Sequence, residues 1–198
     1  MTQTKPKATM THYLVESAIM LAIGTVLSEL SFHGPWALGG SITFCSMLPL
    51  VLISIRYGTK RGLFTALVYS ILQLVLGAAN VQYATSVGMA VGIILLDYIL
   101  PFTAIGFSGA FYRKAKNPRA GLAAGIVVTF LLRLLFHFIS GTWIWEVLWP
   151  NVLGWAAPIW SIVYNGSYMI PEIIITTVVA VLLYATPLRR YFDGEDLK

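Results

Sequence analysis

The amino-acid sequence predicts an all-α integral membrane protein, a bundle of six transmembrane helices with both termini on the cytoplasmic side. Three observations support this prediction: a strongly apolar composition, six apolar runs of about membrane-spanning length, and basic residues confined to alternate connections. Apolar residues make up 58% of the 198 residues, charged residues make up 11%, and the mean hydropathy is +0.78. Soluble domains average about 45–50% apolar and about 25% charged residues, so the composition excludes an ordinary cytosolic domain. We expect a single membrane domain over residues 1–198.

The six spans are placed on runs that approach the roughly 20 apolar residues a helix needs to cross a bilayer. They cover residues 13–30, 42–55, 62–79, 87–111, 120–139 and 160–185. The first run resembles a secretory signal, because Lys5 and Lys7 precede it. Glu16 and Glu29 within the run, and the lack of a small-x-small cleavage site, favour a permanent helix instead.

Lys and Arg accumulate in cytoplasmic loops and therefore indicate the orientation. Under the six-span assignment, twelve of the thirteen basic residues fall on one side, namely Lys5, Lys7, Arg56, Lys60, Arg61, Arg113, Lys114, Lys116, Arg119, Arg189, Arg190 and Lys198. The alternate loops, 31–41, 80–86 and 140–159, contain no Lys or Arg. This distribution predicts a multi-pass protein of the cell membrane with both termini inside. The thirteenth basic residue, Arg133, lies within the fifth span.

The chain carries no motif of a known enzyme class. It has no Gly-x-x-x-x-Gly-Lys-Ser/Thr phosphate loop, no His-Glu-x-x-His and no Gly-x-Ser-x-Gly. The three histidines lack metal-ligand spacing, and the single cysteine, Cys45, can form neither an internal disulfide nor a thiolate metal site. We therefore expect no enzymatic activity, no cofactor and no metal. Nucleic acid is not an expected partner either, despite a pI of about 9.4, because the basic residues are sorted by membrane side.

The tryptophans are distributed on one side only. All six lie in or beside the loops without basic residues, namely Trp36, Trp143, Trp145, Trp149, Trp155 and Trp160. An interfacial aromatic belt is the ordinary interpretation, and we prefer it for Trp149 and Trp155, but such a belt usually occupies both interfaces. The one-sided distribution therefore predicts an aromatic site on the outer side.

Ionisable residues within membrane spans are costly and are functional by default. Arg133 and His137 lie four residues apart in the fifth span, so they share one face, which Gly141 continues. A glycine at that position would let a ligand or a backbone approach closely. In the fourth span, Asp97 stands beside Tyr98.

The sixth span carries a polar stripe in an otherwise apolar helix. Asn165, Tyr168 and Glu172 recur at intervals of three and four residues. Pro171 is expected to kink this helix within the membrane. We interpret Glu172 as structural, capping backbone groups that Pro171 releases, and Glu29 as solvated at the helix rim.

Structural roles remain alternatives for the other groups. Asp97 and Arg133 would form an ion pair that holds two helices together. His137 would be a hydrogen-bonded core histidine, and Asn165 would be a helix–helix contact. The ensemble favours a binding site, because an acid, an imidazole, a carboxamide and several tryptophans converge on the outer half of a small bundle.

This set of side chains suits an organic cation that is itself aromatic. Contact between a cation and an aromatic face contributes about 2 kcal/mol when the site is desolvated. A carboxylate accepts hydrogen bonds from an exocyclic amine, and an Asn carboxamide both donates and accepts at a ring-nitrogen edge. We therefore expect a heteroaromatic cation that bears an amine.

Four segments carry a resemblance to a known family, and the resemblance covers most of the chain, from about Glu16 to Ala185. They are Trp36-Ala-Leu-Gly39-Gly40-Ser41, Leu96-Asp97-Tyr98, Arg133-x-x-x-His137-x-x-Ser140-Gly141 and Tyr164-Asn165-Gly166-Ser167-Tyr168-Met169-Ile170-Pro171-Glu172. In these segments the chain resembles the thiamin-specific S components of energy-coupling factor (ECF) transporters, the ThiT family. The resemblance implies the substrate-binding subunit of an ATP-driven vitamin importer in the lipid bilayer, with a transmembrane coupling subunit and two ATPase subunits as partners.

The resemblance also implies an outward-facing pocket for thiamin, closed by the first extracellular loop. Asp97 would bind the aminopyrimidine, and Asn165 would hydrogen-bond the edge of that ring. Trp145 would stack on the pyrimidine. Arg133 would orient Asp97 and keep it ionised.

The other end of the ligand would contact a second group of residues. Trp36 and His137 would flank the thiazolium, and Tyr98 and Gly141 would lie near the hydroxyethyl end. Trp160 occupies a position where the family pattern leads us to expect a pocket tyrosine. Tryptophan keeps the aromatic face and the donor but lacks an acceptor oxygen.

In the first span, Ala18 and Ala22 lie one turn apart, a pattern that lets membrane helices approach closely. The resemblance implies that this face docks the coupling subunit. Two alternatives stay open: an S component for another vitamin or precursor, such as the thiamin pyrimidine moiety or riboflavin, and a non-transporting membrane scaffold subunit.

Overall fold

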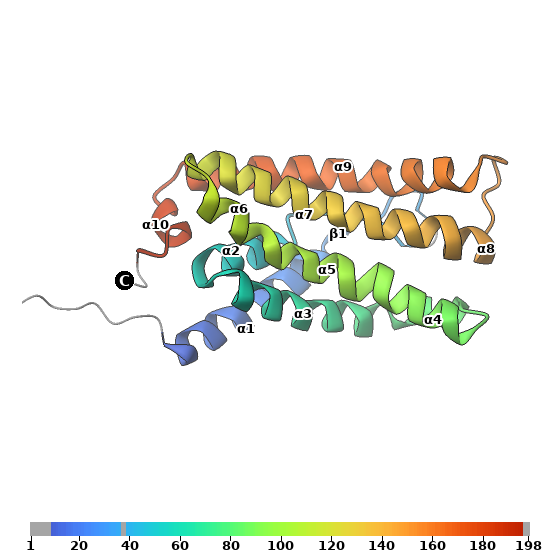
Figure 1. Ribbon diagram of the computed structural model, residues 1–198, viewed down its shortest axis with the longest axis horizontal. Coiled ribbons are helices and arrows are strands. Elements are labelled where there is room, and N and C mark those ends of the chain that lie inside the picture. The colour runs from blue at the N-terminus through green and yellow to red at the C-terminus, as the bar shows by residue number, and fades with distance from the viewer. Residues whose placement is uncertain (1–8, 37–38, 196–198) are drawn as a thin grey trace, which may run out of the picture.

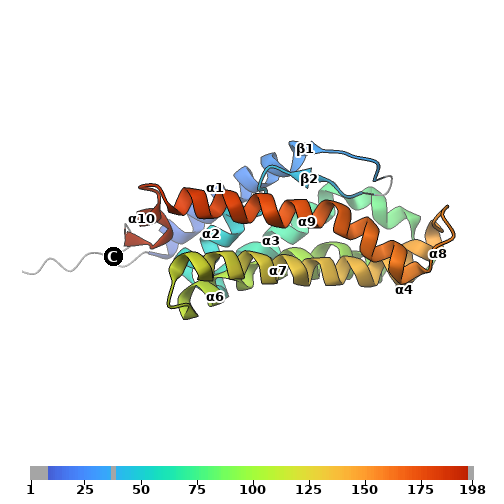
Figure 2. The same cartoon turned by 90° about the horizontal axis from the view of Figure 1, so that it is seen from above.

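The computed structural model describes residues 9–36 and 39–195. Its longer helices are α1 (Met10–Glu29), α2 (Leu48–Tyr57), α3 (Thr59–Leu76), α7 (Pro118–Ser140) and α9 (Ala157–Tyr184). Shorter elements are β1 (Ser31–Phe32), β2 (Ile42–Thr43), η1 (Ala78–Tyr83), α4 (Val87–Ile93), η2 (Ile94–Ile99), α5 (Leu100–Ala104), η3 (Ile105–Phe107), α6 (Ser108–Lys114), η4 (Gly141–Trp145), α8 (Glu146–Leu148) and α10 (Arg189–Phe192). The long helices run side by side in an elongated bundle, as two perpendicular views show (Figures 1 and 2).

The bundle has two distinct ends. The start of α1, the α6–α7 connection and α10 lie at one end, and α4 and α8 lie at the other (Figure 1). The first end carries the described basic residues except Arg133, and we call it the basic end; we call the other the pocket end. Lys5, Lys7 and Lys198, which contribute to the predicted orientation, lie outside the described residues.

Four helical segments are long and apolar enough to cross a membrane: Met10–Glu29, Val87–Lys114, Pro118–Leu148 and Ala157–Tyr184. They coincide with the first, fourth, fifth and sixth predicted spans. The third predicted span corresponds to α3, which carries Lys60 and Arg61 in its first turn. The second corresponds to α2, whose ten residues extend for about 15 Å, half of the apolar thickness of a bilayer.

The predicted boundary of the second span at residue 42 is wrong. Ile42 and Thr43 form β2, which pairs antiparallel with β1 in the register Ser31↔Thr43 and Phe32↔Ile42. The helix begins only at Leu48. Pro49 lies in its first turn, where the missing N–H of proline costs no intrahelical hydrogen bond. The apolar run therefore contains a short strand and a short helix, which hydropathy alone does not distinguish.

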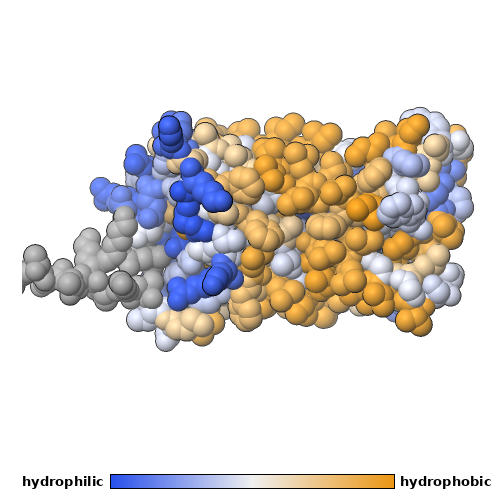
Figure 3. Space-filling model, viewed as in Figure 1, coloured by the Kyte–Doolittle hydropathy of each residue, from blue (hydrophilic) through white to orange (hydrophobic). Residues whose placement is uncertain are grey.

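The surface agrees with a protein embedded in lipid. An apolar band crosses the middle of the visible face, with the most strongly hydrophilic residues at the basic end and further hydrophilic residues at the pocket end (Figure 3). Large apolar side chains such as Ile19, Val178 and Leu182 are half or more exposed, at 52%, 50% and 62%. Soluble monomers rarely expose apolar surface so extensively, whereas lipid covers it at no cost.

Two π-helical turns interrupt the long helices at the pocket end. One, η2, contains Asp97 within the rod that runs from α4 to α6, and the other, η4, contains Gly141 and Trp145 directly after α7. A π turn inserts a residue and rotates the side chains that follow, and such turns occur frequently at functional sites. In α9, by contrast, the helix continues through Pro171.

The basic half of the bundle is held by close backbone approaches around Ser54 of α2. Its hydroxyl donates to the carbonyl of Gly106 at 2.5 Å and accepts from the amide of Gly109 at 3.0 Å. A Cβ on Gly109 would lie 2.1 Å from the carbonyl oxygen of Ser54, so only glycine fits. This packing fixes α2 against η3 and α6 in the basic half of the bundle.

Candidate functional site

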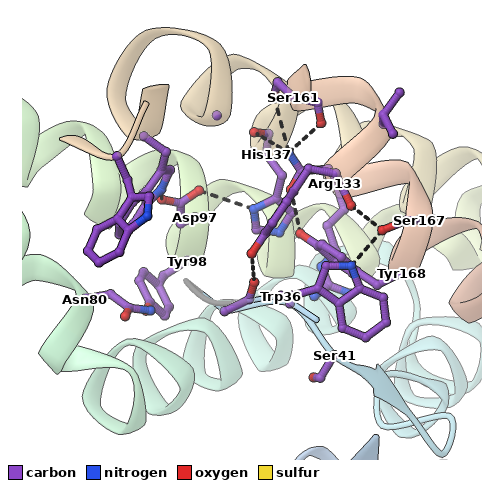
Figure 4. A pocket seen from close by; sticks show the side chains of 18 of the residues that line it. Trp36, Ser41, Asn80, Asp97, Tyr98, Arg133, His137, Ser161, Ser167 and Tyr168 are labelled. Carbon is purple, nitrogen blue, oxygen red and sulfur yellow. Dashed lines mark hydrogen bonds and ion pairs between the residues drawn. The ribbon is translucent and has the colours of Figure 1, made fainter. Parts of the chain in front are cut away.

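A cavity of about 590 Å³ opens at the pocket end. Its walls come from the end of α1, the β1–β2 loop, α3, η2, α7, η4 and α9 (Figure 4). All nine residues that the sequence analysis assigned to ligand binding line this cavity: Trp36, Asp97, Tyr98, Arg133, His137, Gly141, Trp145, Trp160 and Asn165. Ala18 and Ala22, assigned to partner docking, lie elsewhere, on the exposed surface of α1.

The Asp97 carboxylate is held by three donors from one stretch of chain. Trp145 Nε1 lies 2.8 Å and Ser140 Oγ 2.9 Å from Asp97 Oδ2, and His137 Nδ1 lies 3.3 Å from Oδ1. The His137–Asp97 contact is visible in Figure 4. With Nδ1 donating, all three groups are hydrogen-bond donors to the carboxylate. The π turn η4 is what brings Trp145, eight residues after His137, onto the same carboxylate.

Arg133 does not pair with Asp97, so the predicted ion pair and the predicted orienting role are wrong. Its Nη1 lies 3.2 Å from the sulfur of Met47, and its guanidinium carbon lies 4.8 Å from the ring centroid of Phe102. Within the described chain no carboxylate lies within 4.0 Å of Arg133. The physical reason is that His137, one helical turn further on, occupies the Asp97 carboxylate together with Ser140 and Trp145.

The loop that follows β1 is attached to α9 by aromatic and polar contacts. Trp36 donates its indole N–H to Ser167 Oγ at 2.7 Å, and its ring meets that of Tyr168 edge-on at 5.6 Å. The hydroxyl of Tyr164 donates to the carbonyl of Gly39 at 2.9 Å. Gly40 has a φ of +112°, and a Cβ there would lie 2.8 Å from the Tyr168 ring, so the loop requires glycine at this position.

Asn165 makes the helix–helix contact that was considered for it. Its amide nitrogen donates to the carbonyl of Ser161 at 2.9 Å and to that of His137 at 3.3 Å, and its oxygen accepts from the hydroxyl of Tyr168 at 2.6 Å. A hydrogen bond from Asn165 to a ligand must therefore replace one of these contacts. Trp160 packs at the same wall, with its ring 5.8 Å from that of Tyr164.

Tyr98 and Gly141, which were expected near the hydroxyethyl end of the ligand, also make structural contacts within the protein. The Tyr98 hydroxyl donates to the carbonyl of Gly77 and accepts from Asn80, both at 2.9 Å, and so fixes η1. A Cβ on Gly141 would lie 2.3 Å from Ser161 Oγ, so the close approach at this glycine is that of α9. Of the two possibilities considered for Gly141, the structure shows approach by a neighbouring helix.

Glu172 is structural, as predicted, but its partner differs from the prediction. Its carboxylate accepts from the backbone amide of Thr43 at 2.7 Å and from the Thr43 hydroxyl. It therefore caps β2 rather than the backbone around Pro171, because α9 remains helical there. Glu29 is exposed at the cavity mouth, in agreement with the solvated role expected for it.

Several residues that hold the pocket together were given no binding role in the sequence analysis. Ser140, which donates to Asp97, lies three residues after His137, so the shared helix face was a usable signal. Ser167 and Tyr168, which attach the loop, lie in the quoted Tyr164–Glu172 segment. Met47 gave no signal, because an apolar residue in an apolar run has nothing to distinguish it.

These features define a class: a helical membrane protein with an acidic, aromatic ligand pocket at the end of the bundle opposite its basic residues. The sequence model of the family described as "Thiamine transporter protein (Thia_YuaJ)" matches residues 14–191. The chain is 34% identical over 185 residues to "Thiamine transporter ThiT" of Bacillus subtilis (strain 168), covering 87% of this chain and 90% of that protein. The chain therefore belongs to the thiamine transporter family.

Solved structures agree with this assignment. The structure of ThiT from Listeria monocytogenes superposes with a TM-score of 0.73 at 25% identity, covering 90% of this chain and 96% of the other. The S component of a bacterial ECF transporter has the same fold, with a TM-score of 0.61 at 20% identity over 89% of this chain and 95% of the other. The protein is thus a multi-pass protein of the cell membrane and a transport component, and the family is not enzymatic, as the sequence predicted.

Proposed function

We propose that the chain is the substrate-binding S component of an ECF-type importer and that its ligand is thiamin. One observation carries the proposal from the geometry: three hydrogen-bond donors orient the Asp97 carboxylate inside an aromatic cavity, and no Lys or Arg among the described residues pairs with it. Such a group recognises an amine-bearing aromatic cation, which describes thiamin. The named relatives support the same ligand and the same kind of transporter.

In the proposed complex the aminopyrimidine amine donates to Asp97. A carboxylate has about four acceptor positions, and three donors leave one of them for the ligand. Trp145 stacks on the pyrimidine while its indole N–H keeps its hydrogen bond to Asp97. Asn165 gives up one of its hydrogen bonds within the protein and forms one with the edge of the pyrimidine ring. Arg133 does not neutralise the carboxylate, because its guanidinium lies against Phe102 and Met47.

The thiazolium occupies the second half of the cavity. Trp36 and His137 flank the cationic ring, which a neutral imidazole tolerates and a protonated one would repel. Tyr98 and Gly141 lie near the hydroxyethyl end. Trp160 adds a further aromatic face at the position where a tyrosine was expected.

We also infer six membrane crossings with both termini in the cytoplasm. The four long apolar segments support four of these crossings, and we assign the other two to α3 and to α2 with the β-paired loop before it. The concentration of basic residues at the end opposite the cavity supports an outward-facing pocket (Figures 1 and 3).

The proposed partners are a transmembrane coupling subunit and two ATPases. Ala18 and Ala22 lie one turn apart and are exposed on α1, so a partner helix can approach closely there. We assign the docking of the coupling subunit to this face. No nucleic acid, cofactor or metal enters the proposal.

The decisive experiment uses the purified chain without any ATPase. Native mass spectrometry identifies the small molecule that co-purifies, and calorimetry then compares thiamin, its aminopyrimidine moiety and riboflavin at equal concentration. We expect thiamin to co-purify and to bind most tightly. Tighter binding of riboflavin or of the pyrimidine would show a different vitamin or precursor as the ligand, and no binding of any of them would favour a scaffold.

A further inference from the structure

Helix α1 is the least buried of the four segments that are long and apolar enough to cross a membrane. About 17% of its apolar stretch is buried, compared with 33–39% for the other three. Its buried residues are Tyr13, Glu16, Ser17 and Gly24, and the first three of them lie in the half at the basic end. The position of α1 in the bundle therefore depends strongly on the contacts made at that end.

The principal contact there is a buried ion pair with α2. Arg56 Nε lies 2.6 Å from Glu16 Oε1, and Arg56 Nη2 lies 3.0 Å from Glu16 Oε2. The side chain of Arg56 is fully buried, and that of Glu16 is 10% exposed. Tyr57 also donates its hydroxyl to Glu16. A buried pair of this kind requires its remaining hydrogen-bonding positions to be satisfied.

The C-terminal segment satisfies them through one residue, Tyr191 of α10. The Tyr191 hydroxyl donates to Glu16 Oε1, and the Tyr191 carbonyl accepts from Arg56 Nη1. The ring of Tyr191 lies against the guanidinium, with 3.5 Å between its centroid and the Arg56 Cζ. Tyr191 thus contacts both members of the ion pair, 175 residues away from Glu16 in the chain.

The rest of this segment is anchored to the far side of the bundle. Phe192 is buried and packs edge-on against Tyr184 of α9, with 5.5 Å between ring centroids. Asp193 accepts hydrogen bonds from Tyr184 at 3.0 Å and from Tyr112 of α6. Burial would raise the pKa of Asp193, but the hydrogen bonds from Tyr112, Tyr184 and Arg189 outweigh it and lower the pKa, so the group is ionised at neutral pH.

From these contacts we propose that Tyr191 is a positioning residue for partner docking: it ties α1 to α6 and α9 and so sets the placement of the Ala18–Ala22 face. The inference rests on the proposed function for the identity of the partner. None of Glu16, Arg56 and Tyr191 lines the cavity, which lies at the other end of the bundle. Loss of the contacts of Tyr191 with Glu16 and Arg56 therefore affects the docking of the coupling subunit and leaves ligand binding intact.

The test combines two variants with a matched control. Tyr191→Ala removes the whole contact, and Tyr191→Phe keeps the ring on Arg56 but loses the hydrogen bond to Glu16. Arg190→Ala is the control, because Arg190 lies on the same short helix, is 84% exposed in its side chain and pairs only with Glu195 among the described groups. Thiamin binding by each purified variant reports that the bundle is folded.

The direct readout is the distance between spin labels on α1 and α9, measured without ligand or partner. Labels at Ile19 and Leu182, both exposed, are introduced in a Cys45→Ala background. We expect Tyr191→Ala to broaden the distance distribution, Tyr191→Phe to broaden it less, and Arg190→Ala to leave it unchanged. Co-purification with the coupling subunit should fall at least fivefold for Tyr191→Ala, with the thiamin Kd within twofold of wild type.

An unchanged distance distribution, or wild-type co-purification by Tyr191→Ala, would overturn the inference. Failure of the proposed function has a different signature, because the unsubstituted protein would then bind no thiamin or recruit no coupling subunit. In that case the spin-label measurement still decides whether Tyr191 positions α1.

Discussion

The indole nitrogen of Trp145 lies 2.8 Å from the carboxylate of Asp97, although the two residues belong to different π turns in different helical rods. The bond fixes the plane of the indole and the direction of the carboxylate at the same time. One residue thus presents an aromatic face while it orients the acid beside that face.

We expect Asp97→Asn to weaken thiamin binding strongly. Loss of one partner of a buried charge-assisted contact costs roughly 2–5 kcal/mol, which is about 30-fold or more in Kd. Glu172→Gln should weaken binding less, because the Glu172 carboxylate accepts its hydrogen bonds from Thr43 and does not line the cavity. Calorimetry on both folded variants measures the difference, and equal losses would refute this ranking.

Trp145→Phe should lower thiamin affinity by roughly tenfold, since the ring survives but the charge-assisted bond to Asp97 is lost. The change in tryptophan fluorescence on thiamin binding should also diminish. Trp149→Phe is the matched control, because Trp149 lies at the cavity rim and is 53% exposed. A similar loss in both variants would show that aromatic area, and not the hydrogen bond, matters.

Replacement of Arg133 distinguishes the observed arrangement from the ion pair expected from the sequence. Arg133→Met removes a cation from the cavity and leaves the three donors of Asp97 in place. The thiamin Kd should therefore stay the same or decrease, because less positive charge opposes the thiazolium. A loss of affinity as large as that of Asp97→Asn would contradict this prediction and would show that Arg133 supports the Asp97 carboxylate.

Binding and transport should separate on α1. Ala18→Trp and Ala22→Trp place a bulky ring on the exposed face, so close helix approach is blocked while the cavity is unaffected. We expect unchanged thiamin affinity, with uptake and co-purification of the coupling subunit abolished. Val178→Trp, on the exposed surface of α9, controls for a bulky lipid-facing ring. Full uptake by both alanine variants would place the docking face elsewhere.

The orientation has its own test. A reporter fused after Lys198 that is active only in the cytoplasm should be active, whereas one that requires export should be silent, because the described basic residues other than Arg133 lie at one end of the bundle. The reverse result would contradict the six-crossing topology.

The residues of the site were predictable from the sequence, because buried polar groups in an apolar chain are rare and each marks a helix face that points inward. Asp97 and His137 were grouped on this basis, the family resemblance added Trp145, and all three residues line one cavity. The partner of Asp97 was not predictable. Regular helical spacing does not bring His137 and Trp145 onto one acid, and the π turn that does so has no sequence signal.

Hydropathy likewise identified the apolar runs but not the secondary structure within each run. The run from residue 42 begins with a strand, because Ile42 and Thr43 pair with Phe32 and Ser31, ten and twelve residues earlier in the chain. The cap that Glu172 supplies to Thr43 connects residues 129 positions apart. Such contacts depend on how the helices assemble, which no local pattern encodes.

The hydrogen bonds among the pocket side chains have a consequence for selectivity. The Asn165 carboxamide is engaged at both its nitrogen and its oxygen, whereas the Asp97 carboxylate keeps one acceptor position. A ligand's amine therefore gains a new bond at Asp97, while its ring nitrogen only exchanges bonds at Asn165. Under the proposed binding mode we therefore expect analogues without the amine to lose this bond entirely and analogues altered at the ring edge to lose little affinity, so that the exocyclic amine contributes most to discrimination between ligands.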